Sequence, residues 1–255
     1  MQAPLVASNP EPLVNVLHED DALLVVNKPA GLVCHPTKGD AFSSLIGRVR
    51  VYLGETAHPH LINRLDRETS GVTLIAKNDA TALGLRKLWE RREVRKGYLA
   101  IVHGHVREDH GIIDAPLGKD KNSSVAIKDC VLAGGAPAQT AYAVKCRFSR
   151  AEGDFSLLEV EPLTGRKHQL RIHLAHIGHP IVGDKLYGPD EQIYLDFVNY
   201  RLTAEQRARL ILPCHALHAS EVNLAWRGKP WSFAAEPEPG FPEFIPSPIR
   251  WHRAD

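Results

Sequence analysis

Short apolar runs with the alternation typical of β-strands recur along this 255-residue chain, and helical patterns interrupt them at irregular intervals. Strand-like stretches lie at residues 13–20, 22–29, 71–78, 96–104, 111–117, 140–148, 155–163, 216–226 and 230–236. Helix-like periodicity is confined to residues 42–53, 79–93, 168–178 and 203–211. A regular alternation of strand and helix would build a parallel sheet, and this order does not supply one. The sequence therefore predicts an α+β fold with a mixed, largely antiparallel sheet and inserted helices.

The ends of two predicted helices carry specific signals. Asn78 has a side chain suited to an N-cap and precedes the helix expected over 79–93. In the 168–178 stretch, apolar residues share one face at i, i+4 and i+7, and Gly178 is suited to end the helix. Residues 118–139 are rich in Gly, Ser and Lys, so we expect a long loop or flap there.

The distribution of these patterns predicts how the chain is divided. Residues 1–12 contain three prolines and no periodic pattern, which indicates a flexible N-terminal arm. The strand and helix patterns run from about residue 13 to 235, and a chain of this length can bury the core of one large domain. Residues 236–255 are expected to form a C-terminal tail.

Composition and targeting signals indicate an ordinary globular protein. The hydrophobic fraction is 44%, and no apolar run approaches the ~20 residues needed to span a bilayer. The N-terminus has neither the basic head nor the apolar core of a signal peptide. We therefore expect a cytoplasmic protein without membrane association. Its four cysteines are scattered along the sequence, so they are expected to be free thiols.

Positive charge is concentrated locally although the formal net charge is only +1. The stretch 86–96 carries six cations against two acids, and 165–173 carries Arg166, Lys167 and Arg171 with no acid. A balanced total charge can hide such a one-sided distribution, which is the kind that polyanions recognise.

The stretch INRLDRETSG, residues 62–71, sets Asp66 between Arg64 and Arg67 directly before a buried-type strand. An Asp near arginines is most often part of a surface ion pair, and Thr-Ser-Gly is a common turn composition. Taken alone, the stretch therefore leaves both a surface turn and a catalytic carboxylate open.

The same stretch resembles the H-R-L-D-x-x-T-S-G motif of RluA-type RNA pseudouridine synthases. Other blocks similar to this family follow in the family's order, and together they span about residues 13–235. They are VVNKPAGLVCHP (25–36), RKGYLAIVHG (95–104), LTGRKHQLRIHLAHIGHPIVGDKLYG (163–188) and LHASEVNL (217–224). One departure is Asn63, which stands where the family usually has His. Several blocks in one order are far more specific than a single motif.

The resemblance implies an isomerase that detaches uracil from ribose, turns it, and rejoins it through carbon 5. This reaction needs no cofactor and no metal. Asp66 corresponds to the essential carboxylate, and Arg171 matches the active-site arginine that would keep it ionised. Tyr98 matches the active-site tyrosine, which can stack on the base and take part in proton transfer. These residues are expected around a central RNA-binding cleft.

The predicted partner is structured RNA, either ribosomal or transfer RNA. Arg64 resembles the motif arginine expected to enter the space that the flipped uridine leaves. Further candidates for phosphate contacts are Arg91, Arg92, Arg95, Lys96, Arg166 and Lys167. A solvated helix face remains an equal alternative for any one cation of the 86–96 stretch. The modified uridine and the oligomeric state stay open.

Two other functions compete with this interpretation. A metal-dependent hydrolase could use the histidines and the acid that lie close together in this part of the sequence, although their spacing is not that of HExxH. These residues are His168, His173, His176, His179 and Asp184. A catalytically silent RNA-binding protein is the second alternative, and loss of Asp66, Tyr98 or Arg171 would favour it. All three are present.

Overall fold

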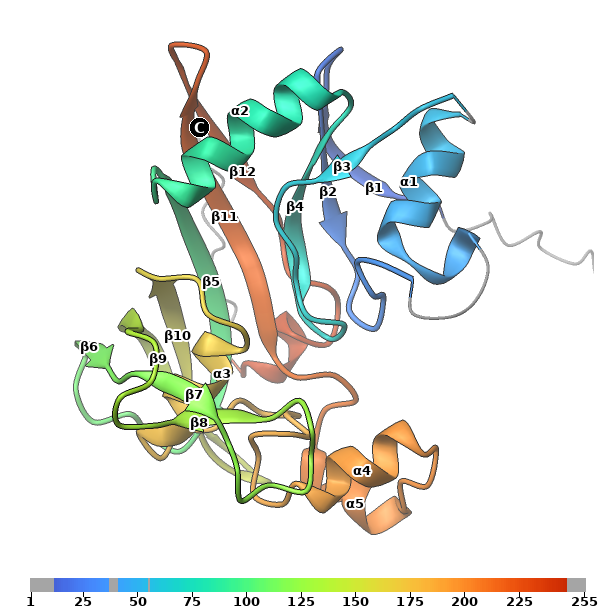
Figure 1. Cartoon of the computed structure of the whole chain (residues 1–255). Coiled ribbons are helices and arrows are strands. Elements are labelled where there is room, and N and C mark those ends of the chain that lie inside the picture. The colour runs from blue at the N-terminus through green and yellow to red at the C-terminus, as the bar shows by residue number, and fades with distance from the viewer. Residues whose placement is uncertain (1–11, 37–40, 55, 247–255) are drawn as a thin grey trace, which may run out of the picture.

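The computed structural model describes residues 12–36, 41–54 and 56–246 (Figure 1). The predicted arm therefore lies outside the described residues except for Pro12, as do residues 247–255 of the predicted tail. The strands are β1 (Asn15–Glu19), β2 (Leu23–Lys28), β3 (His60–Leu61), β4 (Ser70–Ala76), β5 (Val94–His103), β6 (His110–Asp114), β7 (Leu117–Lys119), β8 (Asp129–Val131), β9 (Gln139–Arg150), β10 (Gly153–Pro162), β11 (Leu217–Trp226) and β12 (Lys229–Ala234). The helices are α1 (Leu45–Leu53), α2 (Asp79–Glu90), α3 (Gln169–His176), α4 (Gln192–Val198) and α5 (Ala204–Leu210), with 3-10 turns η1 (Ala41–Ser43) and η2 (Pro242–Phe244).

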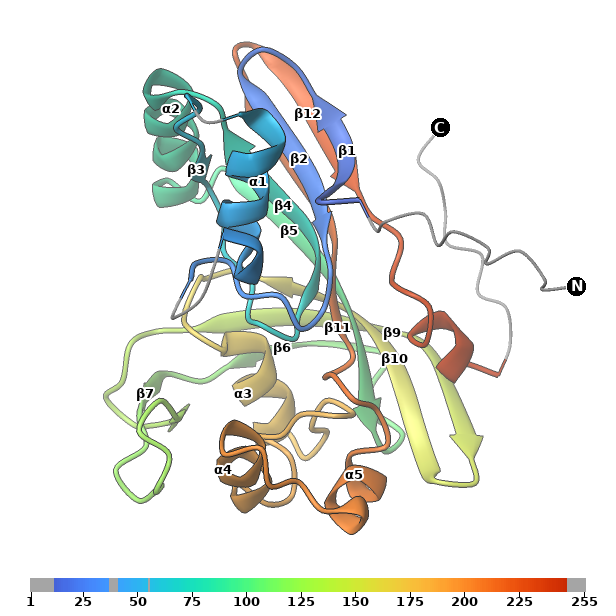
Figure 2. The same cartoon turned by 90° about the vertical axis from the view of Figure 1, so that its right-hand side faces the viewer.

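A 10-stranded sheet runs through the molecule in the order β1-β2-β4-β11-β5-β10-β9-β6, with β3 paired to β4 and β12 paired to β11. The β4–β11 pair is parallel, and the other pairs in this sheet are antiparallel. Helices α1, α2 and α3 lie against the sheet at separate places, whereas α4 and α5 lie away from it, and the helices do not alternate regularly with the strands (Figures 1 and 2). The predicted α+β class with a mixed, largely antiparallel sheet is confirmed.

Local capping explains where several helices begin. The side chain of Asn78 accepts a hydrogen bond from the backbone N–H of Thr81, as its predicted capping role requires. Thr203 and Gln206 form a reciprocal capping box at the start of α5. Helix α4 was not predicted from the sequence, because it has only 7 residues and buries only Ile193.

The segment 118–139, for which a long loop or flap was predicted, is not loop throughout. This segment contains β8, which pairs with β7 to form a 2-stranded sheet of its own. Leu117 and Val131 face each other in that pairing, and both pack into the cluster around α3. The hairpin could not be predicted from the Gly- and Lys-rich composition of this segment, because packing against α3 stabilises the hairpin.

Strand β2 is buried on both faces. Leu24 and Val26 pack with α1, whereas Leu23 and Val25 alternate with them and pack in the cluster that includes α2. Because successive side chains of a strand point to opposite faces, the two clusters cover the two sides of β2. Leu61 and Leu65, which precede Asp66, pack in the same cluster as α1, so this half of the sheet supports the segment that carries Asp66.

A second core occupies the other half of the sheet, where β5 and β10 pack against α3. Phe244 and Ile245 belong to this core, with only 4% and 7% of their surface exposed. The guanidinium of Arg150 stacks 4.3 Å from the centroid of the Phe244 ring. The packed part of the chain therefore continues past residue 235 into the segment that the sequence assigned to the tail.

The described part of the chain contains no helix long and apolar enough to cross a membrane. All four cysteines are free, and Cys34 is buried. The expectation of free thiols is confirmed.

Gly71, the second residue of β4, has a backbone conformation that other residues rarely adopt. Its φ is +116°, and a Cβ at this position would lie 2.2 Å from the backbone oxygen of Ala219 on β11. This close approach permits the parallel pairing of β4 with β11.

We expect Gly71→Ala to lower the free energy of unfolding by about 2 to 4 kcal/mol, because a clash with rigid backbone adds to the strain. Gly153→Ala is the matched control, since Gly153 has φ +136° and nothing within 4 Å of its Cβ position. Urea denaturation of both variants measures the difference. Equal losses in the two variants would contradict the role of the β11 contact.

Candidate active site

A cleft of about 630 Å³ lies between two segments that are distant in sequence. One wall is the loop between β3 and β4, which carries Asp66, and the opposite wall is the segment from Pro162 to Arg171. Tyr98 of β5 also lines the cleft. The cleft thus brings together the three residues that the resemblance implies for catalysis.

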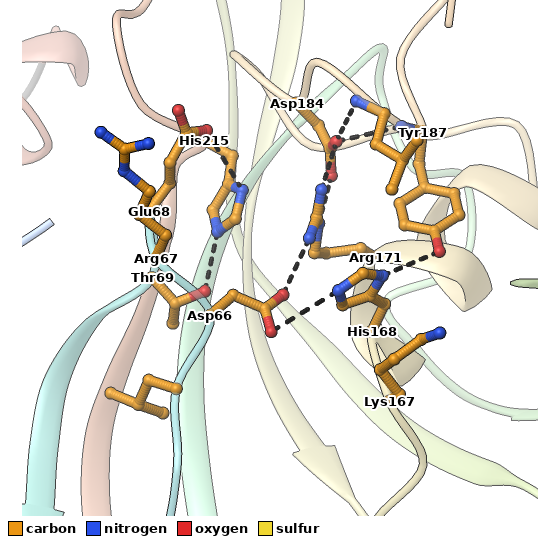
Figure 3. A network of polar contacts seen from close by, with 12 residues as sticks. Asp66, Arg67, Glu68, Thr69, Lys167, His168, Arg171, Asp184, Tyr187 and His215 are labelled. Atoms are coloured by element: carbon orange, nitrogen blue, oxygen red, sulfur yellow. Dashed lines mark hydrogen bonds and ion pairs between the residues drawn. The ribbon is translucent and has the colours of Figure 1, made fainter. Parts of the chain in front are cut away.

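Asp66 and Arg171 form the central ion pair of the cleft (Figure 3). Nη1 of Arg171 donates to Oδ2 of Asp66 at 2.8 Å. The other side of the guanidinium donates two hydrogen bonds to Asp184, from Nε at 2.7 Å and from Nη2 at 2.8 Å. Arg171 therefore bridges two carboxylates, and the predicted contact between Asp66 and Arg171 is present.

Burial and charge decide the ionisation of this triad. The side chain of Asp184 is fully buried, which raises its pKa, but the charge of Arg171 and its hydrogen bonds outweigh burial and hold the pKa well below its usual range. Burial also raises the pKa of Asp66, and the charge of Arg171 again lowers it below the ordinary value. Both carboxylates are therefore ionised at neutral pH, and the pKa of Arg171 is raised despite its burial.

Buried polar contacts hold the Asp66 loop in place. The ammonium of Lys28 donates to the carbonyl oxygens of Pro29, Leu32 and Arg67 at 2.8, 2.8 and 3.2 Å. Burial lowers the pKa of Lys28 to about 8, so the side chain is still mainly charged at pH 7. Its three hydrogen-bond acceptors are carbonyl oxygens. This ties the end of β2 to the residue directly after Asp66.

The residues after Asp66 attach the loop to the segment leading into β11. Thr69 Oγ1 lies 2.7 Å from Nε2 of His215, and Ser70 Oγ lies 2.9 Å from Nδ1 of His218. Burial lowers the pKa of His215 to about 3, so its ring is neutral. The Thr-Ser-Gly sequence thus supplies two hydroxyl contacts and the close approach of Gly71, which a plain surface turn would not need.

Asn63 takes a structural position in this protein. Its Nδ2 donates to the carbonyl of Val72 at 3.1 Å, and its Oδ1 accepts from the N–H of Leu74 at 2.8 Å. The side chain therefore extends the pairing of the loop with β4 while it lines the cleft.

Tyr98 lies on β5 opposite Val160 and Ala219 in the neighbouring strands. Burial, followed by the negative charge of Asp66, raises the pKa of Tyr98 to about 12. The phenol is therefore protonated at neutral pH, and the partly buried Tyr98 lines the cleft.

The predicted RNA-contact residues divide into two groups. Those that line the cleft are Arg64, Lys96, Arg166 and Lys167. A smaller adjoining hollow of about 260 Å³ shares Trp89, Lys96 and Arg166 with the cleft and adds Arg92. Arg91 and Arg95 line neither hollow, and Arg95 forms an ion pair with Glu161 at 3.0 Å.

Three of the four histidines weighed as metal ligands, His168, His173 and His179, have other partners, and His176 is exposed. His173 is buried between the hydroxyl of Thr140 and the carbonyl of Ala115, each at 2.9 Å. Nδ1 of His179 lies 2.8 Å from the carbonyl of His103, while Asp184 pairs with Arg171. Among the residues placed in the structure, no group of three or more His, Cys, Asp or Glu side chains could hold a metal ion.

Two important partners escaped prediction from the sequence. Asp184 was considered only as a possible metal ligand, although its GDKLYG context belongs to the third motif block and could have pointed to a role beside Arg171. His168 was treated in the same way, yet its Nε2 lies 3.8 Å from Oδ1 of Asp66.

Comparison with known proteins points to one family. A family model described as RNA pseudouridylate synthase matches residues 22–176. An uncharacterized RNA pseudouridine synthase of Bacillus subtilis, YlyB, is 36% identical over 190 residues, which cover 72% of this chain and 61% of that protein. The dual-specificity RNA pseudouridine synthase RluA of Pasteurella multocida is 37% identical over 184 residues, covering 71% of this chain and 80% of that protein.

The ribosomal large subunit pseudouridine synthase D of Nitrosomonas europaea is 35% identical over 217 residues, which span 83% of this chain and 58% of that protein. The chain thus spans only about three fifths of several of its relatives. Among solved structures, human RNA Pseudouridylate Synthase Domain Containing 1 superposes with a TM-score of 0.72 at 25% identity, covering 93% of this chain and 89% of that one. The resemblance to RluA-type enzymes is confirmed, and this chain belongs to the RNA pseudouridylate synthase family.

Proposed function

We propose that this protein is an RNA pseudouridine synthase that isomerises a specific uridine without a cofactor. The observation that carries the proposal is the Asp66 carboxylate, which Arg171 keeps ionised at 2.8 Å in a cleft that Tyr98 also lines. An ionised carboxylate can attack the sugar covalently, or it can support or deprotonate a sugar intermediate. Either route breaks the glycosidic bond and leaves uracil free to turn.

Tyr98 and Arg64 have distinct tasks in this proposal. The neutral phenol of Tyr98 stacks on the detached base and takes part in proton transfer at carbon 5. Arg64 is exposed at the rim of the cleft, where a planar cation can occupy the space left by an extruded uridine.

The RNA in this proposal is structured ribosomal or transfer RNA in the cytoplasm. The name of the Nitrosomonas europaea relative specifies the large ribosomal subunit, which makes ribosomal RNA the first candidate to test. The catalytic domain comprises the chain from about residue 13 and includes Phe244 and Ile245, because both belong to its core.

Pseudouridine mapping of total RNA from cells with and without the gene tests the proposal. At least one site should disappear without the gene, and purified protein with excess chelator should restore it on isolated RNA. Unchanged maps together with no conversion by purified protein would contradict the proposal. RNA binding without conversion would support the catalytically silent alternative.

We expect the cations at the two hollows to set the salt dependence of RNA binding. Replacing Arg64, Arg92 and Arg166 by Ala should lower the slope of log K against log salt by about 2 to 3, since each phosphate contact contributes roughly 0.7 to 0.9. Filter binding at several salt concentrations measures the slope.

The control for this experiment is a triple Ala variant of exposed cations outside both hollows, Arg107, Arg207 and Lys229. Its slope should stay at the wild-type value. Equal slopes for both triple variants would mean that the RNA does not follow the cleft.

A further inference from the structure

His168 has an unusual position at the start of α3. Its φ of 54° lies in the left-handed region, and its side chain makes no capping hydrogen bond to the helix. The ring is instead directed between Asp66 and Tyr187, with 11% of the side chain exposed (Figure 3). The backbone conformation thus places an imidazole beside the carboxylate.

The partners of its two ring nitrogens indicate where the neutral His168 ring carries its hydrogen. The Tyr187 hydroxyl lies 2.9 Å from Nδ1 of His168, and the hydroxyl oxygen also accepts a longer hydrogen bond of 3.4 Å from the N–H of Asp129. The other nitrogen, Nε2, faces Oδ1 of Asp66, and an ionised carboxylate only accepts hydrogen bonds, so it attracts a hydrogen on Nε2 and leaves Nδ1 to accept from the Tyr187 hydroxyl. The neutral ring then carries its own hydrogen on Nε2.

That Nε2–H faces the carboxylate. Nε2 lies 3.8 Å from Oδ1 of Asp66, while Oδ2 of Asp66 accepts from Arg171 at 2.8 Å. The two carboxylate oxygens of Asp66 therefore face different groups: Oδ1 faces His168 and Oδ2 faces Arg171. A distance of 3.8 Å is too long for a hydrogen bond, but active-site contacts often shorten when substrate binds.

Several elements contribute charged or titratable groups to this environment. They are Lys28 at the end of β2, Cys34, Tyr98 on β5, Lys167 and Arg171 at α3, Asp184 and Tyr187 in the loop after it, and His215 before β11. Burial lowers the pKa of His168, and the cations Arg171 and Lys167 act in the same direction against the opposing charge of Asp66. His168 is therefore neutral near pH 7.

We propose that His168 is a positioning residue for Asp66: Tyr187 anchors its ring as the Nε2–H tautomer, and this N–H orients Oδ1 and favours the ionised carboxylate. Arg171 supplies the charge, whereas the His168–Tyr187 pair fixes the rotation of the carboxyl group. The role in turnover rests on the proposed function, but the tautomer and the ionisation of Asp66 do not depend on activity.

The tautomer is tested first, by ¹⁵N NMR of histidine-labelled protein, with His168 assigned from the signal that disappears in His168→Gln. We expect hydrogen on Nε2 and none on Nδ1 at pH 7. A His168 signal with hydrogen on Nδ1, or a doubly protonated ring, would overturn the proposal whether or not the protein modifies RNA.

The ionisation of Asp66 is tested next, by ¹³C NMR titration of its carboxyl carbon. His168→Leu removes the donor and should raise the pKa of Asp66 by about half a unit to one unit. His168→Gln keeps an N–H near the position of Nε2 and should restore the wild-type value. Tyr187→Phe keeps the ring of Tyr187 and should give a smaller rise, because His168 loses only its anchor.

Tyr194→Phe is the matched control, since Tyr194 packs in the same apolar cluster as Tyr187. The substitution removes a tyrosine hydroxyl, but the hydroxyl that contacts Nδ1 of His168 is that of Tyr187. This variant should titrate like the wild type. An unchanged pKa of Asp66 in folded Tyr187→Phe and His168→Leu would overturn the proposal. If His168→Leu does not fold, comparing the pKa of Asp66 in Tyr187→Phe with that in Tyr194→Phe still tests the proposal.

Kinetics connect these changes to turnover. In His168→Leu, kcat should fall about tenfold with KM within twofold, and the acidic limb of the pH–rate profile should move upward with the pKa of Asp66. His168→Gln should recover most of kcat. A rise in KM with unchanged kcat, or an unshifted acidic limb, would assign His168 a merely structural or RNA-binding role.

Discussion

Asp66→Asn should abolish pseudouridine formation, with a loss in single-turnover rate of at least about 10⁴-fold. Asn keeps the shape of the side chain and can still accept a hydrogen bond from Arg171, but it provides neither the negative charge nor the nucleophilic oxygen. About a third of the Asp66 side chain is exposed, at 31%, so the fold should be little affected. RNA affinity should stay within about threefold, because the cations that meet phosphates are unchanged.

The matched control is Asp109→Asn, which removes a carboxylate that pairs with Arg147 at 2.7 Å and does not line the cleft. Its rate should equal that of the wild type. Pseudouridine is quantified in single-turnover reactions with purified variants. Clear residual turnover in Asp66→Asn, after contamination with wild-type enzyme has been excluded, would remove Asp66 from its assigned role.

Arg171→Ala should combine a severe loss of turnover with a loss of stability. Two carboxylates lose their shared cation, and the side chain of Asp184 is fully buried. Removing one partner of a buried ion pair typically costs about 3 to 5 kcal/mol. The pKa of Asp66 should rise, so the acidic limb of the residual rate should move to higher pH.

The loss of stability should depend on pH in a defined direction. In the wild type, the pKa of Asp184 lies below its unfolded value of about 4, so its contribution is complete above that pH and is lost as the pH falls through the depressed pKa. Without Arg171, burial is opposed mainly by the backbone N–H groups of Leu186 and Tyr187, so we expect the pKa of Asp184 to rise above the unfolded value. The variant should therefore approach wild-type stability as the pH falls toward about 4, and the difference should be largest at neutral pH.

Urea denaturation between pH 4 and 8 measures this difference, and single-turnover rates over the same range measure the effect on Asp66. Arg171→Lys should recover only part of both properties, because an ammonium cannot reproduce the planar fork that contacts Asp184 twice. Arg166 and Lys167 are weak substitutes for the missing cation: Arg166 donates to the carbonyl of Pro137, and Lys167 pairs with Asp129 at 2.7 Å. Wild-type rates in Arg171→Ala would show that Asp66 does not need this cation.

Local patterns in the sequence predicted much of the secondary structure. Asn78 begins α2, and Gly178, with φ +84°, lies just past the end of α3, as a capping side chain and a glycine in these places indicate. The alternating apolar runs predicted the long strands. The predictions failed for short elements such as α4 and the β7–β8 hairpin, because their stability depends on packing against α3 and the loop after it rather than on their own residues.

The sequence by itself determined which residue types are available for chemistry: one acid between arginines at residue 66, a tyrosine at 98 and an arginine at 171. Only the tertiary structure decided their partners. Arg171 and Asp66 are 105 positions apart, and the buried carboxylate that holds Arg171 from the other side, Asp184, lies in a loop beyond α3. A local pattern specifies a helix or a strand because those contacts lie a few residues apart, whereas the site depends on how the whole sheet and both cores bring distant loops together.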